Sequence, residues 1–233
     1  MKTGKVYMIP TTLGESTINA VIPKDVQQII IDTKYFIVEN IKTTRRFLKR
    51  VEREIDIDEL HFFVLNKHTS PNELESFLTP ALEGNNIGVI SEAGCPGIAD
   101  PGSDIVSIAH LKNLQVVPLV GPSSILLALI ASGMNGQNFC FNGYLPKERN
   151  LRVRKIKELE RLASNGVTQI FMETPFRNNH LLEDLLKQCS PNTTLCIAAN
   201  ISLENEFIRS NKVNEWKKTI PDLNKKPCMF LIG

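Results

Sequence analysis

The feature that most constrains the fold of this chain is a regular alternation of short β-branched or aromatic runs with longer stretches of helical periodicity. Parallel strands need a crossover of a dozen or more residues, which a helix usually supplies. The alternation therefore predicts an α/β fold with a largely parallel sheet. The predicted strands span residues 6–9, 35–38, 61–65, 87–90, 116–119, 139–142, 169–172, 194–198 and 228–232.

Helix signals lie between these runs. Ser70-Pro-Asn-Glu73 is a capping box with proline in the first turn, since the serine oxygen and the glutamate carboxylate can each accept from an otherwise unpaired backbone amide. Two later helices are predicted over residues 151–164 and 178–188.

The length of 233 residues is about one and a half times the roughly 150 residues of a typical domain, which favours two small domains. We place their boundary near Gly121, giving an N-terminal domain of residues 1–120 and a C-terminal domain of residues 121–233. No internal repeat and no Gly/Ser linker separates them, so the two halves are expected to touch.

No membrane span or export signal is evident from the sequence. The longest uncharged stretch, residues 113–146, is interrupted by Pro118, Gly121 and Pro122, and its continuous apolar part is far shorter than the roughly 20 residues that a bilayer requires. The five cysteines are scattered without a Cys-x-x-Cys pair, which favours reduced thiols in a cytoplasmic protein.

The most irregular segment is Ser91-Glu-Ala-Gly-Cys-Pro-Gly-Ile-Ala-Asp-Pro-Gly102, directly after a buried-looking strand. In open α/β sheets, ligands bind beyond the carboxyl ends of strands, and glycine lets backbone amides approach them closely. The segment is therefore the expected ligand loop, with a long structural turn as the alternative. Neither the dinucleotide nor the Walker-type glycine motif is present, which disfavours NAD and ATP.

Two other turns are expected at the same edge of the sheet. Gly121-Pro-Ser-Ser124 precedes an apolar helix, where its serines can serve as helix caps or can bind a carboxylate or phosphate. Pro10-Thr-Thr-Leu-Gly14 follows the first strand. Together with residues 91–102 these turns predict a pocket.

Three other kinds of site are disfavoured. His61, His68, His110 and His180 lack metal-ligand spacing, so no metal is expected. No Gly-x-Ser-x-Gly elbow occurs. Cys95 lies in the glycine-rich loop without a nearby histidine, so we interpret it as a small residue filling a turn rather than as a nucleophile.

Positive charge is concentrated in two segments, although 27 basic and 25 acidic residues leave a net charge of only +2. Residues 42–53 and residues 147–157 each contain six basic residues and one acidic residue. In the first segment the apolar side chains of Phe47, Leu48, Val51 and Ile55 fall on the opposite face of a predicted amphipathic helix. Its basic stripe is either a solvated face or a site for RNA phosphates or a polycarboxylate. The stripe consists of Lys42, Arg45, Arg46, Lys49 and Arg53.

The glycine-rich segment, Val117-Pro-Leu-Val-Gly-Pro-Ser-Ser124 and Phe139-Cys-Phe-Asn-Gly-Tyr-Leu-Pro-Lys147 together resemble, in this order, the tetrapyrrole-methylase-like (class III) S-adenosylmethionine-dependent methyltransferases. They are most similar to the branch that methylates the ribose 2′-oxygen of a cytidine in small-subunit ribosomal RNA. The resemblance implies a parallel sheet in the N-terminal domain, a mixed sheet in the C-terminal domain, S-adenosylmethionine in the cleft between them, and a homodimer.

Carried over onto this sequence, the resemblance implies a cofactor-binding set and an acceptor-side pair. The acceptor-side, catalytic pair is Glu39 and Lys42. The cofactor-binding set is Pro10, Glu92, Ala93, Gly94, Gly97, Ile98, Ala99, Asp100, Ser123, Ser124, Ile125 and Met172. The partner implied is RNA or the small ribosomal subunit.

The chain departs from that branch on the acceptor side. Glu39-Asn-Ile-Lys42 stands where the branch usually has Glu-Asp-Thr-Arg, and Ala199-Asn-Ile-Ser-Leu203 stands where it has Arg-Glu-Leu-Thr-Lys. Two alternatives therefore stay open beside an RNA methyltransferase. One is a methyltransferase of a corrin or porphyrin precursor, and the other is a protein that binds S-adenosylmethionine without catalysis.

Overall fold

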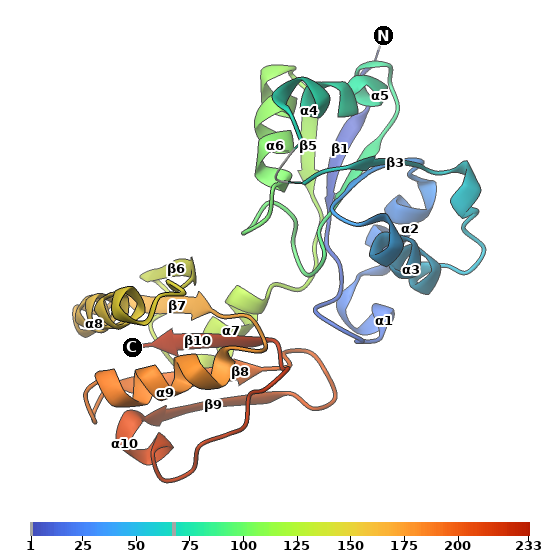
Figure 1. Ribbon diagram of the computed structural model, residues 1–233. Helices are drawn as coiled ribbons and strands as arrows, with labels where there is room; N and C mark the ends of the chain where they lie inside the picture. The colour runs from blue at the N-terminus through green and yellow to red at the C-terminus, as the bar shows by residue number, and fades with distance from the viewer. Residues whose placement is uncertain (1, 67–68) are drawn as a thin grey trace. The chain divides into compact units, whose positions relative to one another are not determined.

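The computed structural model describes residues 2–66 and 69–233, and the chain divides into two units with separate cores (Figure 1). The first unit extends to Ser123 and the second begins at Ser124. The predicted boundary lay three residues earlier, between residues 120 and 121.

The first unit is a five-stranded, fully parallel sheet with helices on both faces. Its strand order is β3-β2-β4-β1-β5. The strands are β1 (Lys5–Ile9), β2 (Tyr35–Val38), β3 (His61–Val64), β4 (Ile87–Ile90) and β5 (Gln115–Pro118). The helices are α1 (Ile18–Val21), α2 (Lys24–Asp32), α3 (Ile41–Val51), the 3-10 turn η1 (Ile57–Glu59), α4 (Pro71–Phe77), α5 (Thr79–Leu82) and α6 (Gly102–Leu111).

Each face of this sheet carries its own hydrophobic core because side chains alternate along the strands. In β1, Val6 and Met8 pack with α4 and α6, whereas Ile9 packs on the opposite face with α2 and α3. The predicted capping box at the start of α4 is confirmed, since Ser70 accepts from the Glu73 amide and Glu73 accepts from the Ser70 amide.

The order of the strands creates a switch point between β1 and β4. From β1 the chain passes through α1 and α2 to β2, which lies on the far side of β4, and from β4 it passes through α6 to β5, which lies on the far side of β1. Two adjacent parallel strands whose connections leave in opposite directions open a crevice at their carboxyl ends. The segments after β1 and β4 meet at that crevice.

The second unit contains a mixed sheet of order β6-β7-β10-β8-β9, which confirms the expected mixed C-terminal sheet. Its strands are β6 (Phe139–Tyr144), β7 (Thr168–Met172), β8 (Thr194–Ala199), β9 (Phe207–Lys212) and β10 (Cys228–Ile232). Its helices are α7 (Ser124–Ser132), α8 (Arg149–Ser164), α9 (Asn178–Gln188) and α10 (Val213–Trp216).

Strand β9 was not predicted from the sequence. It reads Phe-Ile-Arg-Ser-Asn-Lys and forms one edge of the mixed sheet, where a strand pairs on one side only and tolerates polar residues. The antiparallel register with β8, from Phe207 opposite Ala199 to Lys212 opposite Thr194, holds it in place.

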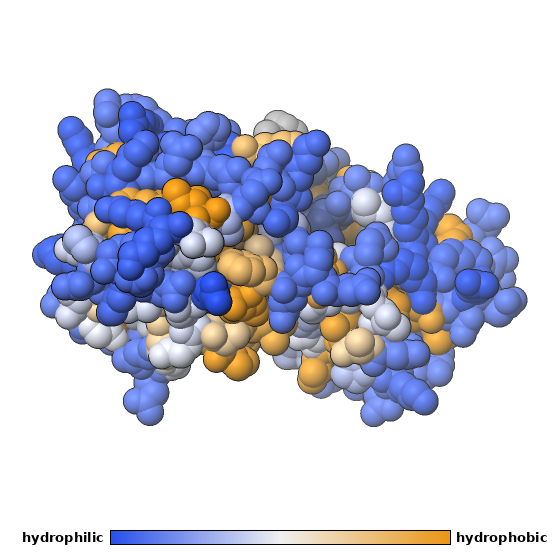
Figure 2. Space-filling view, turned by 90° about the horizontal axis from the view of Figure 1, so that it is seen from below, coloured by the Kyte–Doolittle hydropathy of each residue, from blue (hydrophilic) through white to orange (hydrophobic). Residues whose placement is uncertain are grey.

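The surface drawn in Figure 2 is mostly hydrophilic, with scattered apolar patches. No helix among residues 2–66 and 69–233 is both long and apolar enough to cross a bilayer. All five cysteines are free, and three of them are buried.

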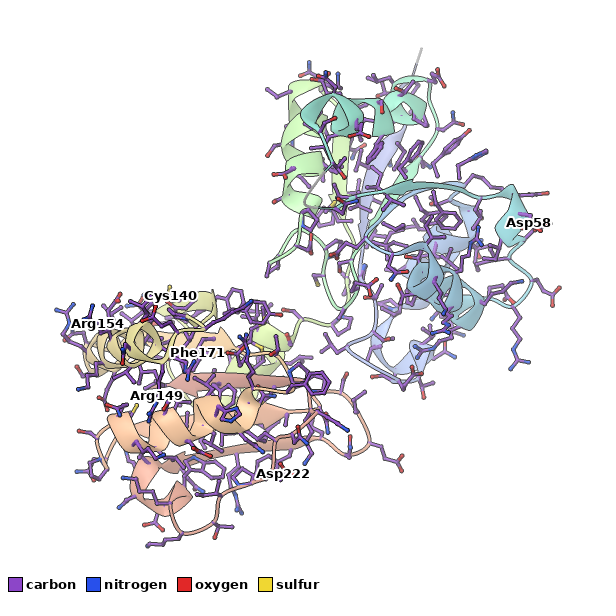
Figure 3. All side chains as sticks on the ribbon, viewed as in Figure 1. Asp58, Cys140, Arg149, Arg154, Phe171 and Asp222 are labelled. Atoms are coloured by element: carbon purple, nitrogen blue, oxygen red, sulfur yellow. The ribbon has the colours of Figure 1, made fainter. Side chains whose placement is uncertain are left out.

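In the second basic segment, residues 147–157, one cation is buried and forms an ion pair. Arg152 on α8 is buried and donates two hydrogen bonds to Asp184 Oδ2, from Nε at 2.9 Å and from Nη2 at 2.7 Å. Its Nη1 also donates to the carbonyl of Lys147 at 2.8 Å, and Arg149 reaches the same aspartate at 3.2 Å. Figure 3 shows Arg149 and Arg154 on this helix.

We expect Asp184→Asn to lower the free energy of unfolding of the second unit by about 3 kcal/mol, because it leaves a buried guanidinium without its counter-charge. Trp216, the one tryptophan of the chain, is buried in this unit, so its fluorescence during urea denaturation reports on that unfolding. Glu183→Gln is the matched control, because the neighbouring Glu183 forms an exposed ion pair with Lys187 and its loss should cost under about 0.5 kcal/mol. Equal effects of the two substitutions would contradict the structural role of Asp184.

Candidate functional site at the switch point

The segments after β1 and β4 are joined directly. The Thr11 amide donates to the Gly94 carbonyl at 2.9 Å, and the Thr11 hydroxyl lies 3.4 Å from the Ser91 carbonyl. Both Thr11 and Ser91 are buried. These bonds hold the two segments together at the carboxyl ends of their strands.

The glycine-rich loop owes its shape to three residues with positive φ and to one carboxylate. Gly94 has a φ of 73°, Gly97 of 85° and Ala99 of 63°, so the loop follows a path that a chain of L-residues disfavours. The Asp100 carboxylate accepts from the Gly97 amide at 2.9 Å and from the Gly102 amide at 2.7 Å. Asp100, predicted as a cofactor residue, therefore binds the loop's own backbone.

The third predicted turn, residues 121–124, also contacts this loop. The Cys95 thiol lies 3.4 Å from the Pro122 carbonyl and 3.8 Å from that of Gly121. A Cβ at Gly121 would lie 2.3 Å from the Pro10 ring, so only glycine permits this approach to the segment after β1. Burial raises the pKa of the Cys95 thiol, which opposes its ionisation and agrees with a turn residue rather than a nucleophile.

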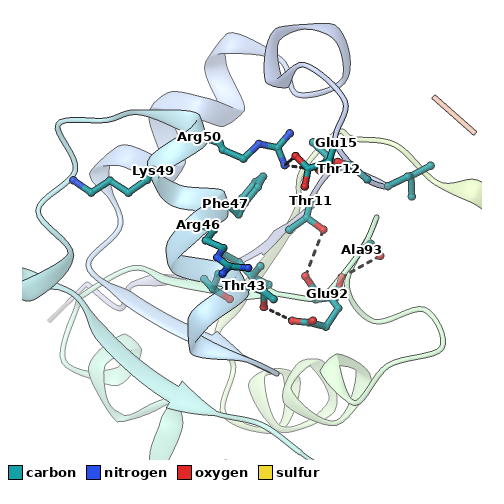
Figure 4. A pocket seen from close by; sticks show the side chains of 15 residues that line it. Thr11, Thr12, Glu15, Thr43, Arg46, Phe47, Lys49, Arg50, Glu92 and Ala93 are labelled. Atoms are coloured by element: carbon teal, nitrogen blue, oxygen red, sulfur yellow. Dashed lines mark hydrogen bonds and ion pairs between the residues drawn. The ribbon is translucent and has the colours of Figure 1, made fainter. Parts of the chain in front are cut away.

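A pocket of about 550 Å³ lies at the switch point within the first unit (Figure 4), and we call it the α3 pocket. Its walls come from residues 11–15 after β1, from residues 43–50 of α3 and from residues 90–93 at the end of β4. One wall therefore carries arginine and lysine, and the others carry hydroxyls and the Glu92 carboxylate.

Two carboxylates meet where α3 begins. Glu39 Oε1 accepts from the Glu92 amide at 3.2 Å, and the Thr43 hydroxyl donates to Glu92 Oε1 at 2.6 Å. Burial raises the pKa of Glu39, and the negative charges of Asp100 and Glu92 add to the rise, while the hydrogen bond from the Glu92 amide opposes it. A carboxylate with a raised pKa beside a pocket is a better proton acceptor than an ordinary glutamate.

Asn40 explains how the altered acceptor-side motif still begins a helix. Its side-chain oxygen accepts from the amides of Lys42 at 2.9 Å and Thr43 at 3.4 Å, and so it caps α3. Asparagine and aspartate cap helices about equally well. The change from the aspartate usual in the resembling branch removes a charge at this point without removing the cap.

Helix α3 carries the predicted basic stripe but is shorter than predicted. It ends at Val51 with Glu52 as the C-cap, so Arg53 lies beyond the helix. In the turn that follows, the Glu52 carboxylate accepts from the Glu54 amide at 3.2 Å, and Ile55 is buried in the core. Arg46 and Lys49 line the α3 pocket, whereas Lys42 does not, and Arg45 lies over the Phe62 ring at 5.4 Å.

Arg50 was not part of the predicted basic stripe, yet it lines the α3 pocket. Its Nη2 donates to the Ser16 carbonyl at 2.5 Å, and its Nη1 lies 3.5 Å from the Thr12 hydroxyl and 3.7 Å from the Glu15 carboxylate. Figure 4 shows Arg50 reaching toward Thr12 and Glu15 while Lys49 extends in another direction. Helical spacing placed Arg50 off the stripe, and only the path of residues 11–17 brings it to the pocket.

A second hollow, of about 560 Å³, lies on the other side of the glycine-rich loop, and we call it the α6 hollow. It is lined by mainly apolar groups of β1, α6 and β5, among them Met8, Pro96, Val106 and Pro118, together with Gly97 and His110. The loop thus has a charged pocket on one side and a more apolar hollow on the other.

The predicted cofactor residues fall in both units. Pro10, Glu92, Ala93, Gly94, Gly97, Ile98, Ala99, Asp100 and Ser123 belong to the first unit, and Ser124, Ile125 and Met172 belong to the second. Within the first unit, all but Ser123 lie in the segments that follow β1 and β4.

Metal ligands are not clustered in the part of the chain that the structure describes. No group of three or more histidine, cysteine, aspartate or glutamate side chains there could hold an ion. His68 lies outside the described residues.

Comparisons with known proteins agree with this geometry. The sequence model of the Tetrapyrrole (Corrin/Porphyrin) Methylases matches residues 22–216. A relative from Buchnera aphidicola subsp. Schizaphis graminum, named Ribosomal RNA small subunit methyltransferase I, is 28% identical over 240 residues, covering 99% of this chain and 78% of the relative. The protein of the same name from Leptospira borgpetersenii is 31% identical over 198 residues, covering 84% and 75%.

Solved structures show the same fold. The methyltransferase CobJ superposes with a TM-score of 0.65 at 17% identity, covering 99% of this chain and 94% of that one. Uroporphyrin-III-C-methyltransferase from Thermus thermophilus gives a TM-score of 0.56 at 16% identity, covering 100% and 93%.

A parallel sheet with a glycine-rich loop at its switch point, followed by a mixed sheet, is therefore the α/β fold that this chain shares with those structures. The chain belongs to the tetrapyrrole methylase family, and it is an S-adenosylmethionine-dependent methyltransferase.

The raised pKa of Glu39 predicts how Glu39→Gln changes stability with pH. The ionised carboxylate is disfavoured in the folded state, so the variant should be the more stable protein at pH 7, by less than about 1 kcal/mol because water screens this half-buried group. As the pH falls through the raised folded-state pKa toward the ordinary value of 4.5, the difference should shrink and then vanish. Denaturation followed by circular dichroism at pH 7 and below pH 4.5 measures the difference in unfolding free energy between the two proteins. A difference that grows on acidification would contradict the raised pKa of Glu39.

Proposed function

We propose that this methyltransferase acts on RNA, and specifically on a ribose 2′-hydroxyl of small-subunit ribosomal RNA. The observation that carries the proposal is the α3 pocket, which Arg46, Lys49 and Arg50 line at the switch point of the sheet, and beside which Glu39 accepts from the amide of the lining residue Glu92. Cations bind the phosphates of a nucleic acid, and a carboxylate can accept a proton from a hydroxyl. The names of the relatives support the same acceptor.

The glycine-rich loop fits S-adenosylmethionine on two structural grounds. Two of its three positive-φ positions, Gly94 and Gly97, are glycines, which let a ligand approach the backbone closely, and its more apolar flank is the α6 hollow. We assign binding of the methionine and adenosine parts to the predicted set from Pro10 to Met172, with backbone groups of residues 92–99 making polar contacts. When bound, the cofactor supplies an electrophilic methyl group on a sulfonium sulfur.

Methyl transfer breaks the bond between sulfur and the methyl carbon and forms a bond from that carbon to the ribose oxygen. The proton of the hydroxyl must leave, and Glu39 receives it in this proposal because its raised pKa favours the protonated form. Lys42, which is exposed next to the Asn40 cap, provides a positive charge beside the substrate phosphates. The remaining catalysis is positioning of the two reactants.

The basic stripe and its surroundings provide the RNA contacts in this proposal. Arg46 and Lys49 line the pocket, and Lys42, Arg45 and Arg53 are exposed close to them along the sequence. The proposal includes a cytoplasmic homodimer that binds the small ribosomal subunit. The free cysteines and the resemblance noted from the sequence support that setting.

The function is tested by transfer of labelled methyl from S-adenosylmethionine to small ribosomal subunits that lack the modification. Free ribosomal RNA and a corrin or porphyrin precursor serve as parallel acceptors. Incorporation into the subunit or the RNA supports the proposal. Incorporation into the tetrapyrrole alone would show that the acceptor is a tetrapyrrole and not RNA. Cofactor binding without any incorporation would identify a non-catalytic binding protein.

We expect Glu39→Gln to lower kcat for methyl transfer to the subunit by about 10²- to 10⁴-fold, the usual contribution of a general base. The affinity for S-adenosylmethionine, measured by calorimetry, should not change, because Glu39 contacts the loop only through the Glu92 amide. An unchanged kcat with normal cofactor binding would show that Glu39 is not the proton acceptor.

We expect Asp100→Ala to weaken S-adenosylmethionine binding by at least tenfold, or about 1.4 kcal/mol, because the Gly97 and Gly102 amides lose the carboxylate that fixes the loop. Asp104→Ala is the matched control, since Asp104 is an exposed carboxylate at the start of α6. Calorimetry distinguishes the two variants, and equal affinities would show that the loop does not depend on Asp100.

A further inference from the structure

The α3 pocket continues into a neighbouring hollow of about 430 Å³, which we call the outer hollow. The two cavities share Glu15, Lys49 and Arg50, and each also has walls of its own. Ser91 and Glu92 line only the α3 pocket, whereas Ser16, Thr17 and Arg53 line only the outer hollow. Together they form one groove along α3.

Cations recur along this groove. Arg46 lines the first cavity, Arg50 lies where the two meet, and Arg53 lines the second. Arg46 and Arg50 are four residues apart on the helix, a rise of about 6 Å. In the part of the chain that the structure describes, neither Arg46 nor Arg53 has its guanidinium in an ion pair, so both charges are available to a ligand.

The Arg50 guanidinium fixes the junction between the cavities. It binds the Ser16 carbonyl and lies near the Thr12 hydroxyl, and so holds the segment after β1 against α3. The Glu15 carboxylate is bound only weakly by Arg50. Its oxygen lies 3.7 Å from Arg50 Nη1, and the Glu15 side chain is 95% exposed. Glu15 therefore supplies a weak internal counter-charge at a place where an anion would fit.

We propose that the groove holds two successive nucleotides of single-stranded RNA, with the acceptor nucleotide in the α3 pocket and its neighbour in the outer hollow. The phosphodiester that joins them lies at Arg50 and displaces Glu15. The proposal rests on the function proposed above and names the smallest ligand that fills the site, a ribodinucleotide. A single-stranded segment suits the groove because separate cavities take bases that are splayed apart rather than stacked in a duplex.

The distribution of charge favours this ligand over a mononucleotide. A mononucleotide in the α3 pocket would leave the Arg53 guanidinium without a ligand. A dinucleotide with a 5′-phosphate places its bridging phosphate between the cavities and its terminal phosphate within reach of Arg53. Each phosphate contact adds affinity and steepens the salt dependence.

The test measures binding of cytidine 5′-monophosphate and of a 5′-phosphorylated cytidine dinucleotide by competition with a labelled ribo-oligonucleotide. The wild-type protein should bind the dinucleotide at least tenfold more tightly than the monophosphate. Arg53→Gln should weaken dinucleotide binding by about fivefold and leave monophosphate binding unchanged, with a salt slope reduced by about 0.7. Glu15→Gln should strengthen dinucleotide binding by about twofold.

Two exposed residues of the first unit provide controls of matching charge. Lys34 and Glu59 form an ion pair outside both cavities, so Lys34→Gln and Glu59→Gln should leave both affinities unchanged. Arg53→Gln acting no more strongly than Lys34→Gln, Glu15→Gln weakening the binding, or equal wild-type affinities for the monophosphate and the dinucleotide would each overturn the two-nucleotide groove. Circular dichroism confirms that the variants are folded.

The same data separate this inference from the proposed function. If the dinucleotide pattern holds but ribosomal subunits receive no methyl group, the proposed function fails and the groove stands. If subunits are methylated while Arg53→Gln and Glu15→Gln behave like their controls, the function stands and the groove fails.

Discussion

The parallel pairing of β1 with β4 is the constraint on which the site depends. The two strands lie side by side in register from Val6 opposite Ile87 to Ile9 opposite Ile90, yet their connections leave in opposite directions. The crevice at their carboxyl ends follows from that topology. The bond from the Thr11 amide to the Gly94 carbonyl then joins the two segments that line it. A loop of unusual backbone conformation is thereby held against a rigid sheet.

Helix α3 brings charged side chains to this crevice, because Arg46, Lys49 and Arg50 line the α3 pocket. Its apolar face packs into the core through Phe47 and Leu48, which fixes the direction in which its basic residues point. The helix begins beside the glycine-rich loop, where the Thr43 hydroxyl binds Glu92 and Glu39 accepts from the Glu92 amide. Cations and carboxylates therefore meet in one cavity, although the net charge of the chain is close to zero.

Several elements were predictable because local signals specify them. Short β-branched runs gave the strands of the first unit, and the Ser70–Glu73 capping box gave the start of α4. Strand β9 was not predicted because an edge strand needs no continuous apolar pattern. The burial of Arg152 was not predicted because nothing near it in sequence reveals the buried Asp184, 32 residues away, that neutralises it.

The sequence by itself determined the α/β class, the position of the glycine-rich loop and the amphipathic character of α3, since each depends on residue types at short spacing. Its motifs also pointed to the methyltransferase family to which the chain belongs. The tertiary structure alone decided that Asp100 binds its own loop, that Arg50 joins two cavities and that Glu39 lies beside Glu92. The contacts of Arg50 and Glu39 join residues 34 or more positions apart, which only the order of the strands brings within hydrogen-bonding distance.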